Sequence, residues 1–150
     1  IILMFIGGCA GSTTCGIKIF RVQILYQFIS NQLKKIIYPR GIFKIKYQNN
    51  NVDEKFMDSI ISFIFLYILI FFVVTALLSL DGLNFITAIS AAATSISNVG
   101  PGLGDIIGPN GSFSSLSDFS KWVLSAAMIL GRLELFAILV LFIPSFWRKY

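Results

Sequence analysis

The sequence predicts an all-α integral membrane protein, and three observations lead to that prediction. Its 150 residues are 56% apolar and only 13% charged, whereas soluble domains average about 25% charged residues. Two apolar runs, residues 60–80 and 122–146, are each long enough to cross a hydrocarbon core of about 30 Å. The stretch between Ser97 and Gly104 holds three glycines and a proline, so it is neither regular helix nor regular strand.

The position of that glycine-rich stretch, between two membrane spans, favours a site for ions. Irregular backbone at membrane depth survives only where protein buries it or where it lines a water-filled path. The backbone carbonyls of residues 97–104 are therefore available to a polar ligand. A dehydrated cation is the ligand that we expect there.

The first 38 residues are expected to form an interrupted helix. Residues 1–6 are apolar and end one helix, and residues 7–16 carry four glycines and three hydroxyl side chains. Because each glycine in a helix costs about 1 kcal/mol relative to alanine, residues 7–16 are not predicted to be helical. From residue 17 to residue 37 apolar side chains return at helical spacing, and Pro39 ends this second helix.

A basic connection follows over residues 39–55. Phe43, Ile45 and Tyr47 alternate with lysines, which predicts a small hairpin with its turn at Asn49 to Asn51. The polar residues that come next are expected to begin the helix that becomes the first membrane span.

Charge predicts the orientation of the chain in the membrane. Eight of the twelve Lys and Arg residues lie in residues 18–55, and two more lie at 148–149. The positive-inside rule places both segments in the cytoplasm, with Asp81, Asp105 and Asp118 on the other side. We therefore attribute the net charge of +5 to cytoplasmic loops rather than to nucleic-acid binding.

Residues 84–97 are predicted to form a short helix that enters the membrane without crossing it. Asn84 is expected to cap this helix, which is rich in Ala and Ser. At about 20 Å it is too short for a span. The predicted order is a membrane span, a half-helix with its loop, and a second membrane span, which is the order in the pore unit of cation channels. The alternative is two spans joined by an ordinary extracellular loop, which does not explain why residues 85–99 are so small and apolar.

Composition also excludes several kinds of site. The chain has no His, and Cys9 and Cys15 are its only cysteines, so a zinc site or a Cys/His nucleophile pair is excluded. Both cysteines are expected to be packing residues rather than a disulfide. With no paired carboxylates in a catalytic setting, we do not expect an enzyme. The chain begins inside an apolar run without Met, so it is expected to be the C-terminal part of a larger protein.

Four motifs resemble those of a known family. They are Gly7-Gly8-Cys9-Ala10-Gly11-Ser12-Thr13, Ser97-Asn98-Val99-Gly100-Pro101-Gly102-Leu103-Gly104, Gly131-Arg132-Leu133-Glu134-Leu135-Phe136 and Pro144-Ser145-Phe146-Trp147-Arg148. In this order and spacing, the chain is similar over nearly its whole length to the TrkH/TrkG-type potassium uptake proteins of the Trk/Ktr/HKT cation transporter superfamily. The resemblance implies membrane helix–pore helix–membrane helix repeats arranged as a pseudo-fourfold, K⁺ channel-like pore.

The resemblance also implies a division of the chain. Residues 1–38 would be the C-terminal inner helix of a third repeat with a glycine-rich intramembrane gate loop at 7–16, residues 39–55 a cytosolic basic loop, and residues 56–150 a whole fourth repeat. Within that fourth repeat, the outer helix would cover 58–80, the pore helix 84–97, the filter 97–104 and the inner helix 119–147.

By the same resemblance, Ser97, Asn98, Val99 and Gly100 form the cation filter, and K⁺ is bound through the backbone of the last three. The preceding helix would point its partially negative C-terminal end toward the ion path. A Cβ at Gly100 is expected to obstruct the backbone geometry that lets four loops converge. The alternative for Gly100 alone is a tight turn.

The gate implied by the resemblance combines the glycine-rich loop with one cation. Its residues are Gly7, Gly8, Gly11, Ser12, Thr13, Gly16 and Arg132. Cys15 stands where the resemblance would place another glycine. A nucleotide-binding loop is the competing interpretation of this loop, but Ile17-Lys18-Ile19 follows it instead of Lys-Ser/Thr.

Arg132 lies near the middle of the last apolar run, where a cation costs about 2.5–3.5 kcal/mol and needs a partner. We expect it to face the pore and to donate hydrogen bonds to carbonyls or hydroxyls of residues 7–16, which would hold the gate closed. The alternative is a structural ion pair, for example with Glu134. An intrahelical pair is poor, because side chains two residues apart on a helix point in different directions.

The expected function is transport of a monovalent cation, with K⁺ favoured, across the cytoplasmic membrane by a multi-pass protein. The alternative is a membrane-embedded structural or assembly subunit, or a non-conducting fragment of such a transporter. The resemblance implies the remaining three repeats, a second copy in a homodimer and a cytosolic nucleotide-binding RCK/KTN regulatory subunit as partners. The basic hairpin would contact that subunit or anionic lipid of the bilayer.

Overall fold

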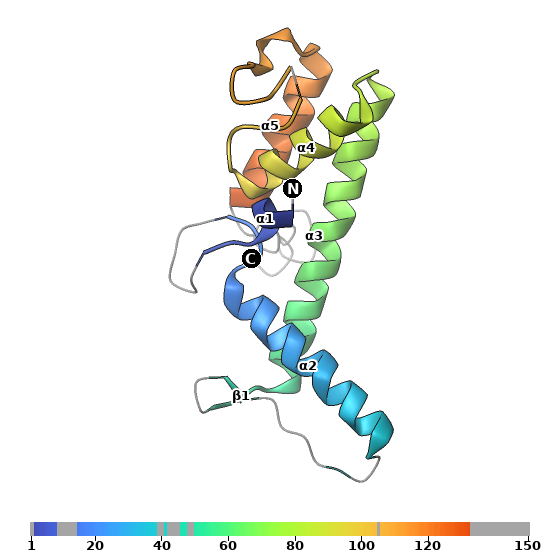
Figure 1. Cartoon of the computed structure of the whole chain (residues 1–150), viewed down its shortest axis with the longest axis vertical. Coiled ribbons are helices and arrows are strands. Elements are labelled where there is room, and N and C mark those ends of the chain that lie inside the picture. Colours follow the sequence, from blue (N-terminus) through green and yellow to red (C-terminus); the bar gives the residue numbers. More distant parts are fainter. Residues whose placement is uncertain are drawn as a thin grey trace, which may run out of the picture.

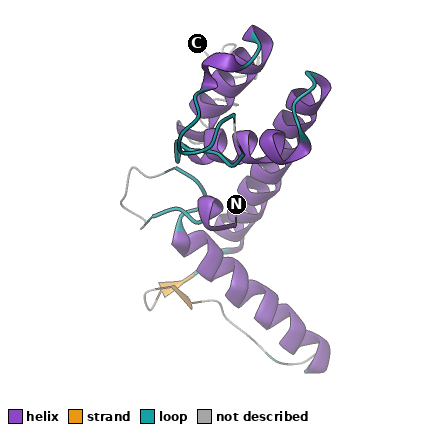
Figure 2. Cartoon of the chain, turned by 45° about the horizontal axis from the view of Figure 1, so that its top comes forward, coloured by secondary structure: helices purple, strands orange, loops and turns teal. Residues whose placement is uncertain are grey.

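The computed structural model describes residues 2–8, 15–38, 41, 46–47, 50–104 and 106–132, and this part of the chain is mostly helical (Figures 1 and 2). Its helices are α1 (Ile2–Phe5), α2 (Ile19–Ile37), α3 (Glu54–Leu80), α4 (Phe85–Ser97) and α5 (Asp118–Arg132), with a 3₁₀ turn at Phe113–Ser115. Two strands of two residues each, β1 (Lys46–Tyr47) and β2 (Asn50–Asn51), form a small antiparallel ladder.

Helix α3 runs along the long axis of the molecule (Figure 1). It begins at Glu54, four residues before the expected start of the outer helix, because Asp53 occupies its N-cap position and no helix-breaking residue follows. Within the described residues, α3 is the one helix whose length and composition suffice to cross a membrane, with a mean hydropathy of 2.9 in its most apolar window. Only 28% of that window is buried, so most of its apolar surface faces away from this chain.

The second expected span, residues 122–146, is described only up to Arg132, where the described part of α5 ends. The expected inner helix, 119–147, therefore lies partly outside the described residues.

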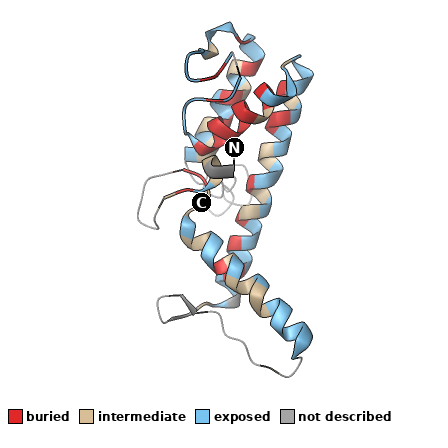
Figure 3. Cartoon of the chain, viewed as in Figure 1, coloured by how far each residue is buried: buried red, intermediate tan, exposed pale blue. Residues whose placement is uncertain are grey.

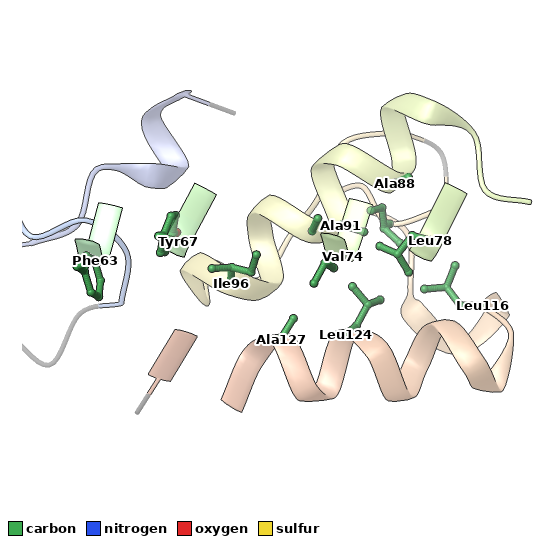
Figure 4. Packing of buried hydrophobic residues seen from close by; sticks show 12 residues of the cluster. Phe63, Tyr67, Val74, Leu78, Ala88, Ala91, Ile96, Leu116, Leu124 and Ala127 are labelled. Atoms are coloured by element: carbon green, nitrogen blue, oxygen red, sulfur yellow. The ribbon is translucent and has the colours of Figure 1, made fainter. Parts of the chain in front are cut away.

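Helix α4 lies between α3 and α5 and forms the core of the molecule (Figures 1 and 3). Ten of its thirteen residues are buried, which shows that this short apolar helix is an interior element. Its small side chains let the neighbouring helices approach closely. Figure 4 shows the resulting cluster, in which α4 contributes Ala88, Ala91, Ala92 and Ile96, α3 contributes Phe63, Tyr67, Val74 and Leu78, and the α5 region contributes Leu116, Leu124 and Ala127.

One local expectation was wrong. The hairpin turn was expected at Asn49 to Asn51, but Tyr47 pairs with Asn50 and Lys46 with Asn51, so the last two asparagines belong to a strand. Only two residues separate β1 from β2, a common connection length in hairpins.

Asn84 stands at the N-cap position of α4, as expected. Its carbonyl accepts the Ala88 N–H at 2.8 Å as the first hydrogen bond of the helix, and its side chain makes no capping bond.

A carboxylate joins the end of α3 to the beginning of α5. Asp81, directly after α3, accepts hydrogen bonds from the Ser117 hydroxyl and, at 2.6 Å, from the buried Ser120 hydroxyl. Ser117 also caps α5, because its hydroxyl accepts the Ser120 N–H at 3.1 Å. These hydrogen bonds, first from Ser117 and then from Ser120, hold the pKa of Asp81 below its ordinary value of 3.8.

This arrangement predicts a pH dependence. Because the folded-state pKa of Asp81 is depressed, its stabilising contribution is present above about pH 3.8 and is lost as the pH falls through the folded-state value. We expect Asp81→Asn to lower the thermal unfolding midpoint at pH 7 and to leave it nearly unchanged once Asp81 is protonated in the wild type. The control is Asp118→Asn, which removes only an exposed ion pair with Lys121. An equal deficit of Asp81→Asn at both pH values would contradict the prediction.

Candidate functional site

The candidate site begins where α4 ends. Asn98 has a left-handed backbone with φ of 52°, a conformation that Asn tolerates better than most residues. Its N–H donates to the Ser95 carbonyl at 3.3 Å, and the Val99 N–H donates to the Thr94 carbonyl at 3.1 Å. This pair of bonds is the Schellman motif, here with Asn in the position that Gly usually takes.

A third backbone N–H, that of Gly100, also donates a hydrogen bond to α4. The Gly100 N–H donates to the buried Thr94 hydroxyl at 3.0 Å. The N–H groups of residues 98, 99 and 100 therefore all point toward α4. In a trans peptide the N–H and the preceding carbonyl point in opposite directions, and no cis bond occurs in the described part of the chain. The carbonyls of Ser97, Asn98 and Val99 consequently point away from α4.

These three carbonyls are free to bind something else. No donor among the described residues reaches the carbonyl oxygens of Ser97, Asn98, Val99 or Gly100. The loop is also open, since Asn98, Val99 and Gly100 are all exposed. Pro101 has no N–H, so the direction of the Gly100 carbonyl is not set in the same way. Three of the four expected filter carbonyls thus share an arrangement that could ligate a cation.

Gly100 has a reason to be glycine within this chain alone. A Cβ built on Gly100 meets nothing within 4 Å of this chain, and the expected obstruction where four loops converge stays a prediction. Its φ of 112° is the constraint, because residues with a side chain rarely adopt it.

The rest of the glycine-rich loop runs back along α4. The Ser90 hydroxyl donates to the Leu103 carbonyl at 3.0 Å. Gly102 must be small, because a Cβ there would lie 2.5 Å from Cδ1 of Ile107. A loop that doubles back along its own helix keeps residues 98–100 at the C-terminal end of that helix, where the backbone carries partial negative charge.

Helices α3 and α5 hold the end of α4 from two sides. The Tyr67 hydroxyl of α3 and the Ser97 hydroxyl form a buried hydrogen bond of 2.9 Å. The Asn98 side chain donates from Nδ2 to the Met128 carbonyl of α5 at 3.1 Å. Sequence reasoning had named Ser97 and Asn98 for their backbones alone. It missed Tyr67 and Met128, because nothing in a linear pattern links residues thirty positions apart. It also missed Thr94, although that residue lies only six positions before its partner Gly100.

Gly131 brings α5 against the last turn of α4. A Cβ at Gly131 would lie 1.9 Å from the Ile96 carbonyl oxygen and 3.1 Å from Nδ2 of Asn98. Sequence reasoning quoted this glycine only as part of a motif. A lone glycine in an apolar helix was the available signal, since small residues mark close helix contacts in membranes.

The glycine-rich segment, residues 7–16, is described at its two ends only. Gly11, Ser12 and Thr13 lie outside the described residues. At the ends, the Gly7 N–H donates to the Ile17 carbonyl at 2.6 Å, and the Ile19 N–H donates to the Gly8 carbonyl at 3.2 Å. These backbone hydrogen bonds join residues 7 and 8, at the start of the segment, to residues 17 and 19, just after its end. We call this paired region the neck of the segment.

Two of the expected gate glycines are required by this neck. A Cβ at Gly7 would lie 2.9 Å from the carbonyl oxygens of both Cys15 and Ile17. Gly16 has a φ of 87°, which favours glycine. The structure therefore gives Gly7 and Gly16 a structural reason to be glycine that is independent of any gating role.

We expect Gly7→Ala to open the neck. Both contacting atoms are backbone oxygens, so the chain has to separate, and the Gly7–Ile17 hydrogen bond of 2.6 Å is lost at a cost of about 1–3 kcal/mol. Limited proteolysis between residues 7 and 19 should become faster. Gly82→Ala is the control, because Gly82 lies in the turn after α3 and a Cβ on it meets nothing within 4 Å, and equal cleavage of the two variants would contradict the prediction.

Arg132, at the end of the described part of α5, reaches that segment. Its Nη1 donates to the Sγ of Cys15 at 3.8 Å, and Cys15 is a buried free thiol. The expected contact with residues 7–16 was to a carbonyl or hydroxyl, whereas this one is to a thiol at the position where the resemblance had implied glycine. Glu134, the alternative partner, lies outside the described residues.

The segment also lies close to the C-terminal end of α4. Helix α1 contacts α4, and Phe5 packs edge-on against Tyr67 and Phe71 of α3, with ring centroids 5.9 Å and 5.1 Å away. The structure thus brings together the neck at residues 7 and 16, Arg132 and the residues 97–100. Within the described residues no group of three or more His, Cys, Asp and Glu side chains could hold a metal ion.

Comparison with known proteins places the chain in one family. A family model described as TrkH, cation transport protein, matches residues 1–149. The chain is 44% identical over 147 residues to the Trk system potassium uptake protein TrkI of Halomonas elongata, covering 98% of this chain and 30% of that protein. It is 37% identical over 145 residues to the Trk system potassium uptake protein TrkH of Escherichia coli K12, covering 97% and 29%.

Comparison with a solved structure supports the same family assignment. The crystal structure of the potassium transporter TrkH from Vibrio parahaemolyticus superimposes with a TM-score of 0.86 at 36% identity, over 97% of this chain and 31% of that one. The chain therefore spans about a third of the length of the relatives that it matches. On the family match over residues 1–149, this chain belongs to the TrkH family of cation transport proteins.

Proposed function

We propose that this chain supplies one loop of a K⁺ pathway, and that the backbone carbonyls of residues 97–100 are ligands for the ion. One observation carries the proposal: three consecutive carbonyls point away from α4 and accept no hydrogen bond from the described residues. Oxygen atoms held in this way replace the hydration shell of a cation.

One such loop cannot surround an ion, so further loops are needed. We propose that they come from three more repeats of the same kind, consistent with relatives about three times as long as this chain. The names of those relatives as potassium uptake proteins support K⁺ as the ion. We call this chain, together with the segments that supply the other loops, the assembled transporter.

We propose that α3, α4 with its loop, and α5 are the outer helix, pore helix and inner helix of one repeat in the cytoplasmic membrane. The basic residues 18–55 would then lie on the cytoplasmic side, where a nucleotide-binding regulatory subunit is a candidate partner, and a second copy a candidate dimer partner. The glycine-rich segment 7–16 and Arg132 would form the gate. The contact between Arg132 and Cys15 supports that last assignment.

The test is K⁺-limited growth. Expression of the assembled transporter in a bacterial strain that lacks its own K⁺ uptake systems should restore growth in low-K⁺ medium and produce K⁺ influx. Correct insertion into the membrane without any cation influx would overturn the proposal and would favour the structural or assembly subunit instead.

A further inference from the structure

We propose that Thr94 is a positioning residue for ion selectivity, at the end of a row of hydroxyls on α4 that holds the glycine-rich loop in its ligating conformation. The inference rests on the proposed function, because it concerns how residues 97–100 would be held as ion ligands. It assigns a role to side chains that do not touch the ion.

The row consists of Thr87, Ser90 and Thr94, all buried. Their spacing of three and four residues puts them on one face of the helix. Each lies against a different part of the loop. Thr94 accepts the Gly100 N–H at 3.0 Å, Ser90 donates to the Leu103 carbonyl at 3.0 Å, and Thr87 Oγ1 lies 3.2 Å from the position of a Cβ on Gly104.

Thr94 differs from the other two because it controls two successive peptide planes. Its carbonyl accepts the Val99 N–H at 3.1 Å, and its hydroxyl accepts the Gly100 N–H. The first bond directs the Asn98 carbonyl away from α4, and the second does the same for the Val99 carbonyl. A side-chain substitution can remove only the second bond, so it separates the effect on the Val99 carbonyl from the rest of the motif.

The second bond is needed because little else holds that peptide plane. Gly100 has no Cβ, so its backbone can leave the present φ of 112° for other values at little cost. Pro101 contributes no N–H that could hold the following plane. Without the Thr94 hydroxyl, the plane between Val99 and Gly100 is free to turn an N–H, rather than a carbonyl, toward the ion.

Such a turn would replace an oxygen ligand by a positively polarised N–H. The choice between K⁺ and Na⁺ depends on the number and placement of the coordinating oxygens. Loss of one hydrogen bond of ordinary strength shifts the balance between the two orientations of the peptide plane. We therefore expect the preference for K⁺ over Na⁺ to fall by roughly fivefold when the hydroxyl is removed.

The experiment compares three substitutions in the assembled transporter. Thr94→Val keeps the shape of the side chain and removes the hydroxyl, whereas Thr94→Ser keeps the hydroxyl and removes the methyl group. Thr75→Val is the matched control, because Thr75 is a buried threonine whose hydroxyl bonds only within α3, to the Phe71 carbonyl at 2.8 Å. The measurement is the relative flux of K⁺ and Na⁺, with the amount of assembled protein determined in parallel.

We expect Thr94→Val to lose K⁺ selectivity while Thr94→Ser and Thr75→Val retain it. Unchanged selectivity in Thr94→Val, or an equal loss in Thr94→Ser, would overturn the inference while leaving the proposed function standing, because the wild type would still carry K⁺. Absence of cation flux in the wild type would instead overturn the proposed function. If Thr94→Val does not assemble, Thr94→Ala is compared with Thr94→Ser by the same criterion.

Discussion

Replacing Gly131 by alanine is expected to destabilise the protein, although the same change in an ordinary helix stabilises it by about 1 kcal/mol. The new Cβ would lie 1.9 Å from the Ile96 carbonyl oxygen and 2.8 Å from the carbon of that carbonyl. Because both are backbone atoms, no rotamer change relieves the overlap, and α5 has to move away from α4. Overpacking of this kind costs about 3 kcal/mol at the upper end of its usual range.

That movement would also separate residues 97–100, the proposed ion ligands, from α5. The Asn98 side chain bonds to the Met128 carbonyl at 3.1 Å, one turn before Gly131. We therefore expect Gly131→Ala to lower both the thermal unfolding midpoint of the purified assembled transporter and its K⁺ influx. Ala126→Ser, which adds one heavy atom to the same helix at an exposed position, is the control. A midpoint at or above that of the wild type would show that the two helices do not meet at Gly131.

Gly100→Ser is expected to abolish K⁺ influx with only a moderate loss of stability. A side chain at φ of 112° costs about 1–3 kcal/mol, and the backbone can avoid this strain by rotating. Rotation would break the Gly100–Thr94 hydrogen bond and turn the Val99 carbonyl away from its present direction. The effect should exceed that of Thr94→Val, because strain at Gly100 forces this rotation, whereas loss of the Thr94 hydroxyl only permits it. Influx of K⁺ into cells that lack other uptake systems is the measurement.

Gly82→Ser provides a closely matched control for that experiment. Gly82 has a φ of 87°, and a Cβ on it also meets nothing within 4 Å, but it lies in the turn after α3. Both serine variants should therefore lose similar stability, and only Gly100→Ser should lose influx. Equal influx in the two would mean that the conformation of Gly100 has no part in binding the ion.

Several elements of the fold were predictable because they depend on local composition. The apolar run at 60–80 and the small residues at 85–97 indicated a long helix and a short one, and the structure has α3 and α4 there. Capping and turn details were less predictable, since the side chain of the N-cap residue Asn84 makes no capping bond and Asn50 pairs in a strand. Side-chain propensity indicates which residue types suit a cap or a turn, but several local conformations of similar energy compete at such positions.

The residues of the candidate site were named from the sequence, but the contacts that arrange them were not. Ser97 and Asn98 stood out by their place before Gly100, whereas their partners Tyr67 and Met128 lie thirty residues away in opposite directions along the chain. Arg132 was expected to contact the glycine-rich segment and does so through Cys15, a residue that had counted only as a departure from the motif.

The sequence by itself determined the hydrophobic lengths, the places where helices stop and the positions that only glycine fills, because these follow from each residue's own chemistry and that of its near neighbours. Only the tertiary structure decided which way the peptides of residues 97–100 face and why Gly131 has no side chain. The physical reason is that a peptide plane rotates at little cost until a partner fixes its N–H. In this chain the partners of these N–H groups belong to the preceding turn of α4, whereas the Ile96 carbonyl that excludes a Cβ at Gly131 belongs to a helix that meets α5 only on folding.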